Sequence, residues 1–151
     1  MAELKERLRA DLNAAMRARD QVRMRTLRLA LTSITNEEVA GTSARDLTDD
    51  EVVRVLTREA RKRREAAEAF GAAGRSDQAA AERAEGEVLA GYLPAQLSDD
   101  ELAALVDAAI AETGASGLSG LGQVMKRVTP RIAGRADGAR VAAEVRRRLS
   151  G

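Results

Sequence analysis

Few residues in this chain could carry out covalent or metal chemistry. The sequence has no cysteine and no histidine, so it lacks the thiolate and imidazole groups that most nucleophilic and zinc sites use. Only Lys5, Lys62 and Lys126 could activate a serine, and neither a Gly/Ser-rich amidase stretch nor a Gly-x-x-x-x-Gly-Lys phosphate loop surrounds them. We therefore expect no catalytic residue, no cofactor and no independent enzymatic activity, although acid–base work by carboxylates alone stays open.

Two acidic clusters, 49–51 and 99–101, could suggest a metal site. Each directly follows a Thr or Ser that opens a helical pattern. Carboxylates in the first turn of a helix complement its dipole, and no His or Cys lies near to complete a metal site. We interpret both clusters as helix starts and expect no metal.

Charge is strongly segregated along the sequence. Residues 1–94 hold 17 basic and 17 acidic side chains, and residues 95–125 hold five acids and no Lys or Arg. Residues 126–151 hold eight Lys or Arg against Asp137 and Glu144, a net charge of +6. This segregation suggests an anionic partner for the C-terminal part. The abundance of arginine is by itself weaker support for an anionic partner, because 22 Arg against 3 Lys suggests a GC-rich bacterial genome.

The basic segment is a candidate RNA surface. Guanidinium groups fork onto phosphate oxygens, and Gly134 and Gly138 would allow close backbone approach. The helix that starts near Gly138 could hold a phosphate, unless Asp137 already caps it. The candidate cations are Lys126, Arg127, Arg131, Arg135 and Arg140. The alternative interpretation is a solvated basic surface.

The scarcity of aromatic residues limits how RNA could be read. Phe70 and Tyr92 are the only two, and both lie outside the basic segment, where we expect them in the core. Single-strand readers stack bases on aromatic rings, so recognition here should follow phosphate position and shape, as on a folded tRNA. A second basic run, residues 61–64, is diluted by glutamates and favours a solvated helix face.

Apolar residues recur every three or four positions, which predicts helices throughout. Asp20, Thr48 with Glu51, and Ser98 with Glu101 are the clearest helix starts; Gly41, Gly114 and Pro130 are the expected stops. The predicted helices are 3–18, from 20 to Gly41, from 48 to the 71–74 turn, 76–92, from 98 to Gly114, 121–129, and from 138 to the C-terminus.

These patterns predict an all-α protein in two parts. The expected parts are residues 1–94 and residues 95–151, joined near Leu93-Pro94. The charged N-terminus is unlike a signal peptide, and no apolar run approaches the roughly 20 residues that span a bilayer. We expect a cytoplasmic protein with no membrane partner.

Six stretches carry a resemblance to a known family: residues 11–16, Leu27-Arg28, residues 47–52, residues 92–97 with their Tyr-Leu-Pro, residues 122–126, and Gly-Arg-Ala-Asp-Gly at 134–138. Together they resemble the YqeY family over nearly the whole chain; Thr129 departs from the apolar residue usual there. This family shares its C-terminal domain with the tail of GatB, an amidotransferase subunit whose tail contacts tRNA. The resemblance implies an N-terminal helical bundle followed by a small three-helix C-terminal domain. It also implies RNA-facing positions at Lys126, Gly134, Arg135, Asp137 and Gly138.

Three functions follow as hypotheses. The first is a non-catalytic accessory protein that binds tRNA or another structured RNA through its C-terminal domain. The second is a component linked to glutamine-dependent tRNA amidotransferase activity, a carbon–nitrogen ligase chemistry with glutamine as amido donor. The third is a helical adaptor whose N-terminal helices dock a protein partner.

Overall fold

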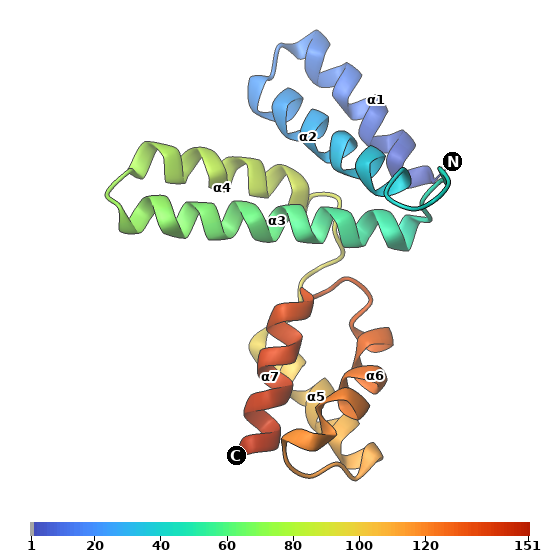
Figure 1. Ribbon diagram of the computed structural model, residues 1–151. Helices are drawn as coiled ribbons and strands as arrows, with labels where there is room; N and C mark the ends of the chain where they lie inside the picture. The colour runs from blue at the N-terminus through green and yellow to red at the C-terminus, as the bar shows by residue number, and fades with distance from the viewer. Residues whose placement is uncertain (1) are drawn as a thin grey trace. The chain divides into compact units, whose positions relative to one another are not determined.

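The structure is a computed structural model that describes residues 2–151, and all regular secondary structure in that range is helical (Figure 1). The elements are α1 (Glu3–Ala18), α2 (Gln21–Glu38), α3 (Asp49–Ala72), α4 (Ser76–Ala90), α5 (Asp99–Thr113), η1 (Leu118–Gly120), α6 (Leu121–Ile132) and α7 (Gly138–Ser150). The prediction of seven α-helices without a strand is confirmed for these residues. The short 3-10 helix η1 was not predicted.

The predicted capping chemistry sets where the helices begin. Thr48 Oγ1 accepts a hydrogen bond from the Glu51 backbone N–H, and the Glu51 carboxylate accepts from the Thr48 N–H, both at 3.2 Å. Ser98 and Glu101 form the same reciprocal pair before α5. These caps satisfy N–H groups that the first turn of a helix leaves without partners.

Two predicted helix stops are wrong. Gly41 adopts no left-handed conformation, and α2 ends earlier, with Val39 as its C-cap at φ −106°. Pro130 does not break α6, which continues to Ile132. The helix continues because Ile132 is buried in the core, and that burial offsets the hydrogen bond that Pro130 cannot donate. Gly114, in contrast, closes α5 with φ +67° as expected.

The chain divides into two compact units, the first ending at Leu93 and the second spanning Pro94–Gly151. In the first unit α1 lies beside α2, and α3 and α4 form a long hairpin (Figure 1). Tyr92 is buried with the aliphatic core, as predicted, whereas Phe70 is only half-buried. The buried core of this unit consists of Leu8, Leu27, Ala30, Ile34, Leu47, Val52, Val55, Leu56, Leu89 and Tyr92.

The second unit packs α5, α6 and α7 around a separate core. The buried residues are Leu97, Leu102, Val106, Ala109, Val124, Val128, Ile132, Ala136, Val141 and Val145. The Gly/Ser segment before α6 is packed closely, because a Cβ on Gly120 would lie 2.6 Å from the Ala115 Cβ. The second unit therefore has an aliphatic core of its own.

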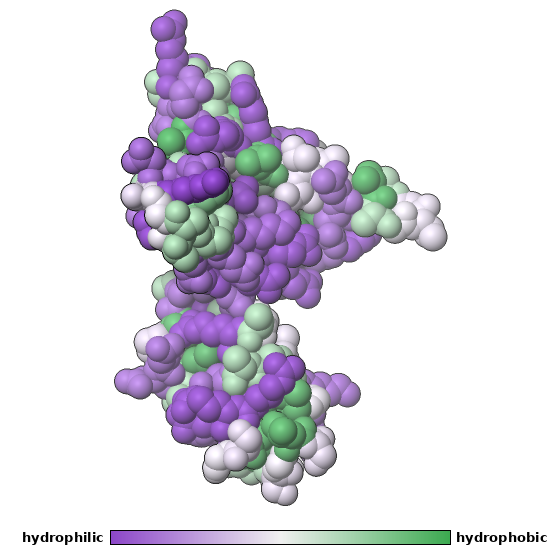
Figure 2. Space-filling view, turned by 60° about the vertical axis from the view of Figure 1, so that its left-hand side comes forward, coloured by the Kyte–Doolittle hydropathy of each residue, from purple (hydrophilic) through white to green (hydrophobic). Residues whose placement is uncertain are grey.

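The exposed surface is largely polar. On the face shown in Figure 2, hydrophobic patches are separated by hydrophilic residues. Within residues 2–151 the large apolar side chains that remain exposed are Met16, Leu29, Val39 and Leu118. Single exposed apolar residues are normal on proteins, so they do not by themselves identify a docking surface for an adaptor.

We expect a fragment of residues 94–151, made alone, to retain its helices. Its core contains no residue of the first unit, although a chain of about 60 residues is near the lower limit for independent stability. A cooperative thermal transition followed by far-ultraviolet circular dichroism would check this. A spectrum typical of an unfolded chain would contradict the predicted domain division at 94/95.

Candidate nucleic-acid interface

The acidic and basic segments of the second unit pair with each other. Carboxylates of α5 lie against arginines of α6, α7 and the turn that joins them. The pairs are Arg127–Glu112 (3.9 Å), Arg131–Glu112 (2.6 Å), Arg135–Glu101 (3.7 Å), Arg140–Asp99 (2.8 Å) and Arg148–Asp107 (3.3 Å). The net charge of +6 on residues 126–151 is therefore largely offset by its fold partners, and the C-terminal part is not a uniformly positive surface.

Three candidate cations share the exposed face of α6. Lys126, Arg127 and Arg131 line an open hollow of about 460 Å³ together with Thr113, Gln123 and Pro130. The face is polar because the opposite side of α6 buries its valines and Ile132 in the core. Within residues 2–151, Lys126 has no carboxylate partner, and a single carboxylate, Glu112, contacts the two arginines. This face therefore keeps an excess of positive charge.

Glu112 is held by its arginine neighbours. The hydrogen bond donated by Arg131 is the largest cause of a lowered Glu112 pKa, and the charges of Arg131 and Arg127 act in the same direction. The same contact raises the pKa of Arg131. Glu112 is therefore ionised at neutral pH and partly neutralises the α6 face.

The backbone of the turn between α6 and α7 holds the start of α5. The Leu97 N–H donates to the Arg135 carbonyl at 2.8 Å, and the Gln96 side-chain amide donates to the Gly134 carbonyl at 3.3 Å. Arg135 Nε also donates to the Ala95 carbonyl at 3.3 Å. Gly134 has φ +79°, a conformation that favours glycine. These residues have structural partners inside their own unit.

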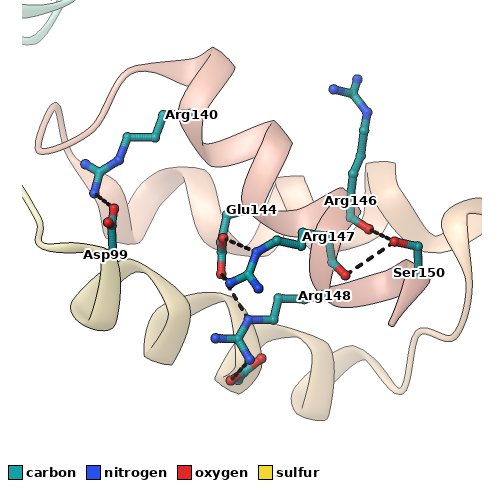
Figure 3. A network of polar contacts seen from close by, with 8 residues as sticks. Asp99, Arg140, Glu144, Arg146, Arg147, Arg148 and Ser150 are labelled. Carbon is teal, nitrogen blue, oxygen red and sulfur yellow. Dashed lines mark hydrogen bonds and ion pairs between the residues drawn. The ribbon is translucent and has the colours of Figure 1, made fainter.

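Asp137 caps α7, which was the alternative that the sequence left open. Its carboxylate accepts from the Arg140 backbone N–H at 2.9 Å, and the residue is 9% exposed. Arg140 in turn pairs with Asp99 (Figure 3). A phosphate at this helix start would have to compete with the Asp137 carboxylate. Gly138 is exposed, and an added Cβ there would meet no atom within 4 Å.

The eight candidate positions fall into two groups rather than one site. Lys126, Arg127 and Arg131 lie with Glu112 at the end of α5, whereas Gly134, Arg135, Asp137, Gly138 and Arg140 lie with its first turn. Asp99 and Glu112 are about 20 Å apart along the helix at its usual rise per residue. The group at the first turn contains more carboxylates than cations, so the positive charge is concentrated on α6.

The end of α7 adds one exposed cation that was not among the candidates. Arg147 and Arg148 both contact Glu144, and the hydrogen bond from Arg147 is the largest cause of the lowered Glu144 pKa. Arg146 points away from this network, and its guanidinium makes no ion pair within residues 2–151 (Figure 3). The consecutive arginines gave a signal in the sequence, but only the fold distinguishes Arg146 from its neighbours.

The first unit contains a polar network that the sequence interpretation missed. Arg63 was expected on a solvated face, but its side chain is largely buried between α3 and α4. Its Nε lies 3.0 Å from Glu85 Oε2, and its guanidinium lies 3.8 Å from Glu59 and from Glu82. Arg25 from α2 also pairs with Glu85 at 2.8 Å. The network joins three helices.

Tyr92 joins the end of the first unit to α1 and α2. Its hydroxyl donates to Asp11 Oδ2 at 2.5 Å, and Arg23 donates to the same hydroxyl at 3.4 Å. The Arg7 guanidinium lies 4.6 Å from the ring centroid. The fold thus brings together two of the stretches that carried the family resemblance, Asp11–Met16 and Tyr92–Leu97.

Within residues 2–151 no group of three or more carboxylates has the geometry of a metal site, and no helix has the length and apolarity needed to cross a bilayer. A family model described as Yqey-like protein matches residues 5–149, nearly the whole chain. A search of curated proteins found no match.

Proposed function

The chain belongs to the YqeY-like protein family, and on that premise we propose that it is a non-catalytic, cytoplasmic accessory protein that binds structured RNA such as tRNA. We place the contact on the α6 face, defined by Lys126, Arg127 and Arg131. The two arginine-rich groups of the second unit are not equivalent in this proposal, because the positive charge is concentrated around α6.

The observation that carries the proposal is the clustering of these three cations around one open hollow. Among the described residues Lys126 has no carboxylate partner, so it can contact a phosphate without breaking an ion pair. Gln123 adds a neutral hydrogen-bonding group to the lining of the hollow. Basic side chains that converge on a concave surface contact a phosphodiester backbone favourably and release its counterions.

The second unit contains no aromatic residue, because Phe70 and Tyr92 both precede it. It therefore has no ring on which an unpaired base could stack. Contacts to phosphates position a protein on RNA without reading its bases, so the proposed surface would distinguish folded shapes rather than sequences. A compact RNA that brings several phosphates close together is the best-matched partner.

The available nucleophiles support a non-catalytic role. The chain has no cysteine or histidine, and its serines have structural partners in several places. Ser98 caps α5, Ser33 Oγ donates to Glu59 at 2.8 Å, and Ser150 Oγ donates to the Arg146 carbonyl at 2.8 Å. None of these three serines contacts a lysine that could serve as a base.

We expect the variant Lys126→Ala/Arg127→Ala to bind tRNA at least about tenfold more weakly than the unmodified chain at low salt. Loss of two phosphate contacts should flatten the slope of log K against log salt by about 1.4–1.8, at 0.7–0.9 per contact. Fluorescence anisotropy with labelled tRNA over a salt series measures both quantities.

Arg17→Ala/Arg54→Ala is the matched control. It removes the same charge from exposed positions of the first unit and should leave the slope nearly unchanged. Undetectable binding of the unmodified chain at low salt would contradict the proposed function. Equal binding by the Lys126→Ala/Arg127→Ala variant would contradict only the α6 face and would favour another surface.

A further inference from the structure

One carboxylate oxygen of Glu112 contacts two of the three cations on the α6 face. Glu112 Oε2 lies 2.6 Å from a terminal nitrogen of Arg131 and 3.9 Å from one of Arg127. Glu112 comes from α5, whereas both arginines belong to α6, so the packing of the two helices sets this arrangement. Glu112 therefore occupies the position from which an anionic ligand would contact both guanidinium groups.

These contacts are suited to exchange. The side chains of Arg131, Arg127 and Glu112 are 36%, 52% and 42% exposed, so water and salt screen the ion pairs. Solvent-exposed ion pairs of this kind contribute little to stability. A phosphate can accept two parallel hydrogen bonds from one guanidinium, which makes it a strong replacement for the carboxylate.

We propose that Glu112 is an intramolecular competitor of RNA phosphate and determines the specificity of the α6 face. The inference rests on the proposed function and deepens it. Glu112 holds Arg127 and Arg131 in the unbound protein, and RNA phosphates displace it when they bind.

Competition by Glu112 favours ligands with closely spaced phosphates. A single phosphate can replace Glu112 at the two arginines, but the displaced carboxylate stays near the negative charge of the phosphate. The net gain in binding free energy is therefore small. Two or more phosphates held together by a folded RNA can engage Lys126 first and then both arginines. The carboxylate thereby disfavours isolated anions and extended, flexible RNA relative to a compact fold.

The competition also predicts a specific salt dependence. When an RNA phosphate displaces Glu112 from the arginines, the freed carboxylate attracts a cation from solution. This uptake offsets part of the counterion release from the RNA. Removing the carboxylate charge should therefore steepen the slope of log K against log salt, by less than the roughly 0.7–0.9 that one phosphate contact contributes. The full chain with Glu112→Gln tests this, because glutamine keeps the size of the side chain.

We expect Glu112→Gln to bind tRNA roughly three- to tenfold more tightly than the unmodified chain at low salt, with the steeper slope. Asp107→Asn is the matched control, because it removes one charge from the same helix beside Arg148 and away from the α6 face. It should change affinity by less than about twofold. Unchanged binding by Glu112→Gln, or equal gains in both variants, would overturn the inference.

A second comparison separates competition from simple repulsion. In the background Arg127→Ala/Arg131→Ala, Glu112 has no guanidinium to hold, so Glu112→Gln should no longer raise affinity. A gain of the same size in that background would mean that Glu112 only repels RNA, and the competitor role would fall.

The two proposals can fail separately. If tRNA binds Glu112→Gln but not the unmodified chain, the competitor role stands, whereas RNA binding by the unmodified chain is contradicted. If tRNA binds both with the same affinity and slope, the competitor role falls and the proposed function survives. If neither protein binds at low salt, both proposals fall.

Discussion

Replacing Arg63 with Ala should lower the free energy of unfolding by about 2–4 kcal/mol, because the change leaves buried carboxylates without their counter-charge. Glu59 and Glu85 are only 6% and 7% exposed, and Arg63 lies against both of them as well as Glu82. Arg25 and Lys62 reach this network from more exposed positions and offset only part of the loss. Urea unfolding followed by circular dichroism measures the difference.

Arg54→Ala is the control for this variant. Arg54 lies on the exposed side of the same helix, so its loss should change stability by less than about 0.5 kcal/mol. The double variant Arg63→Ala/Glu85→Gln should be less destabilised than the sum of its two single changes, because each single change already removes the Arg63–Glu85 contact. Equal stability of the Arg63→Ala and Arg54→Ala variants would contradict a buried network.

The geometry of the network explains its sensitivity. Arg63 Nε and Glu82 Oε2 are both buried, and neither has a well-directed hydrogen bond within residues 2–151. The Nε atom lies 3.0 Å from Glu85 Oε2, so the contact is an ion pair in which the N–H does not point well at the oxygen. Buried charges held by such contacts depend on the whole arrangement rather than on one strong bond.

Local signals in the sequence predicted where helices begin. A capping box places its two partners three residues apart, so Thr48 with Glu51 and Ser98 with Glu101 could be recognised without knowledge of the fold. Asp20 likewise caps α2 by accepting from the Arg23 N–H at 3.1 Å. Such contacts form within one helical turn, and tertiary packing did not change them.

Helix ends and buried charges were harder to predict because they depend on distant residues. Pro130 has an unfavourable local effect on α6, but the burial of Ile132 in the core outweighs it. Lys5 resembles any charged residue of an amphipathic helix, yet it is buried with Glu38, 2.8 Å away and on another helix. No pattern within a few residues reveals such a partner.

In the candidate interface, too, local features were predictable from the sequence and contacts between distant segments were not. The sequence identified a segment rich in cations and an acidic segment before it, but it could not show that the two segments pair. The predicted helix ended at residue 129, before Arg131, whereas α6 continues to Ile132 and brings Lys126, Arg127 and Arg131 around one hollow. The turn residues 134–138 were grouped with them by proximity in sequence, and the fold directs them to the other end of α5.

Tyr92 should lose its proton in the folded protein only near pH 12, which makes stability fall between about pH 10 and pH 12. Burial is the largest cause that raises the pKa of Tyr92 from 10.0 to about 12, and the hydrogen bond to Asp11 adds to it. Because the pKa is higher in the folded state than in the unfolded state, the stabilisation is complete below pH 10. It is lost as pH rises through the folded pKa, and it amounts to at most about 2–3 kcal/mol.

Tyr92 is the only tyrosine and the chain has no tryptophan, so the near-ultraviolet absorbance of the phenolate reports this one residue. We expect a titration midpoint well above pH 10 in buffer and near pH 10 in concentrated urea. Tyr92→Phe should cost about 1–2 kcal/mol at neutral pH, since Asp11 loses a donor, and should remove the Tyr92 part of the alkaline loss. Comparing the two proteins cancels the titration of every other group. A midpoint near pH 10 in the folded protein would contradict both the burial of the hydroxyl and its hydrogen bond to Asp11.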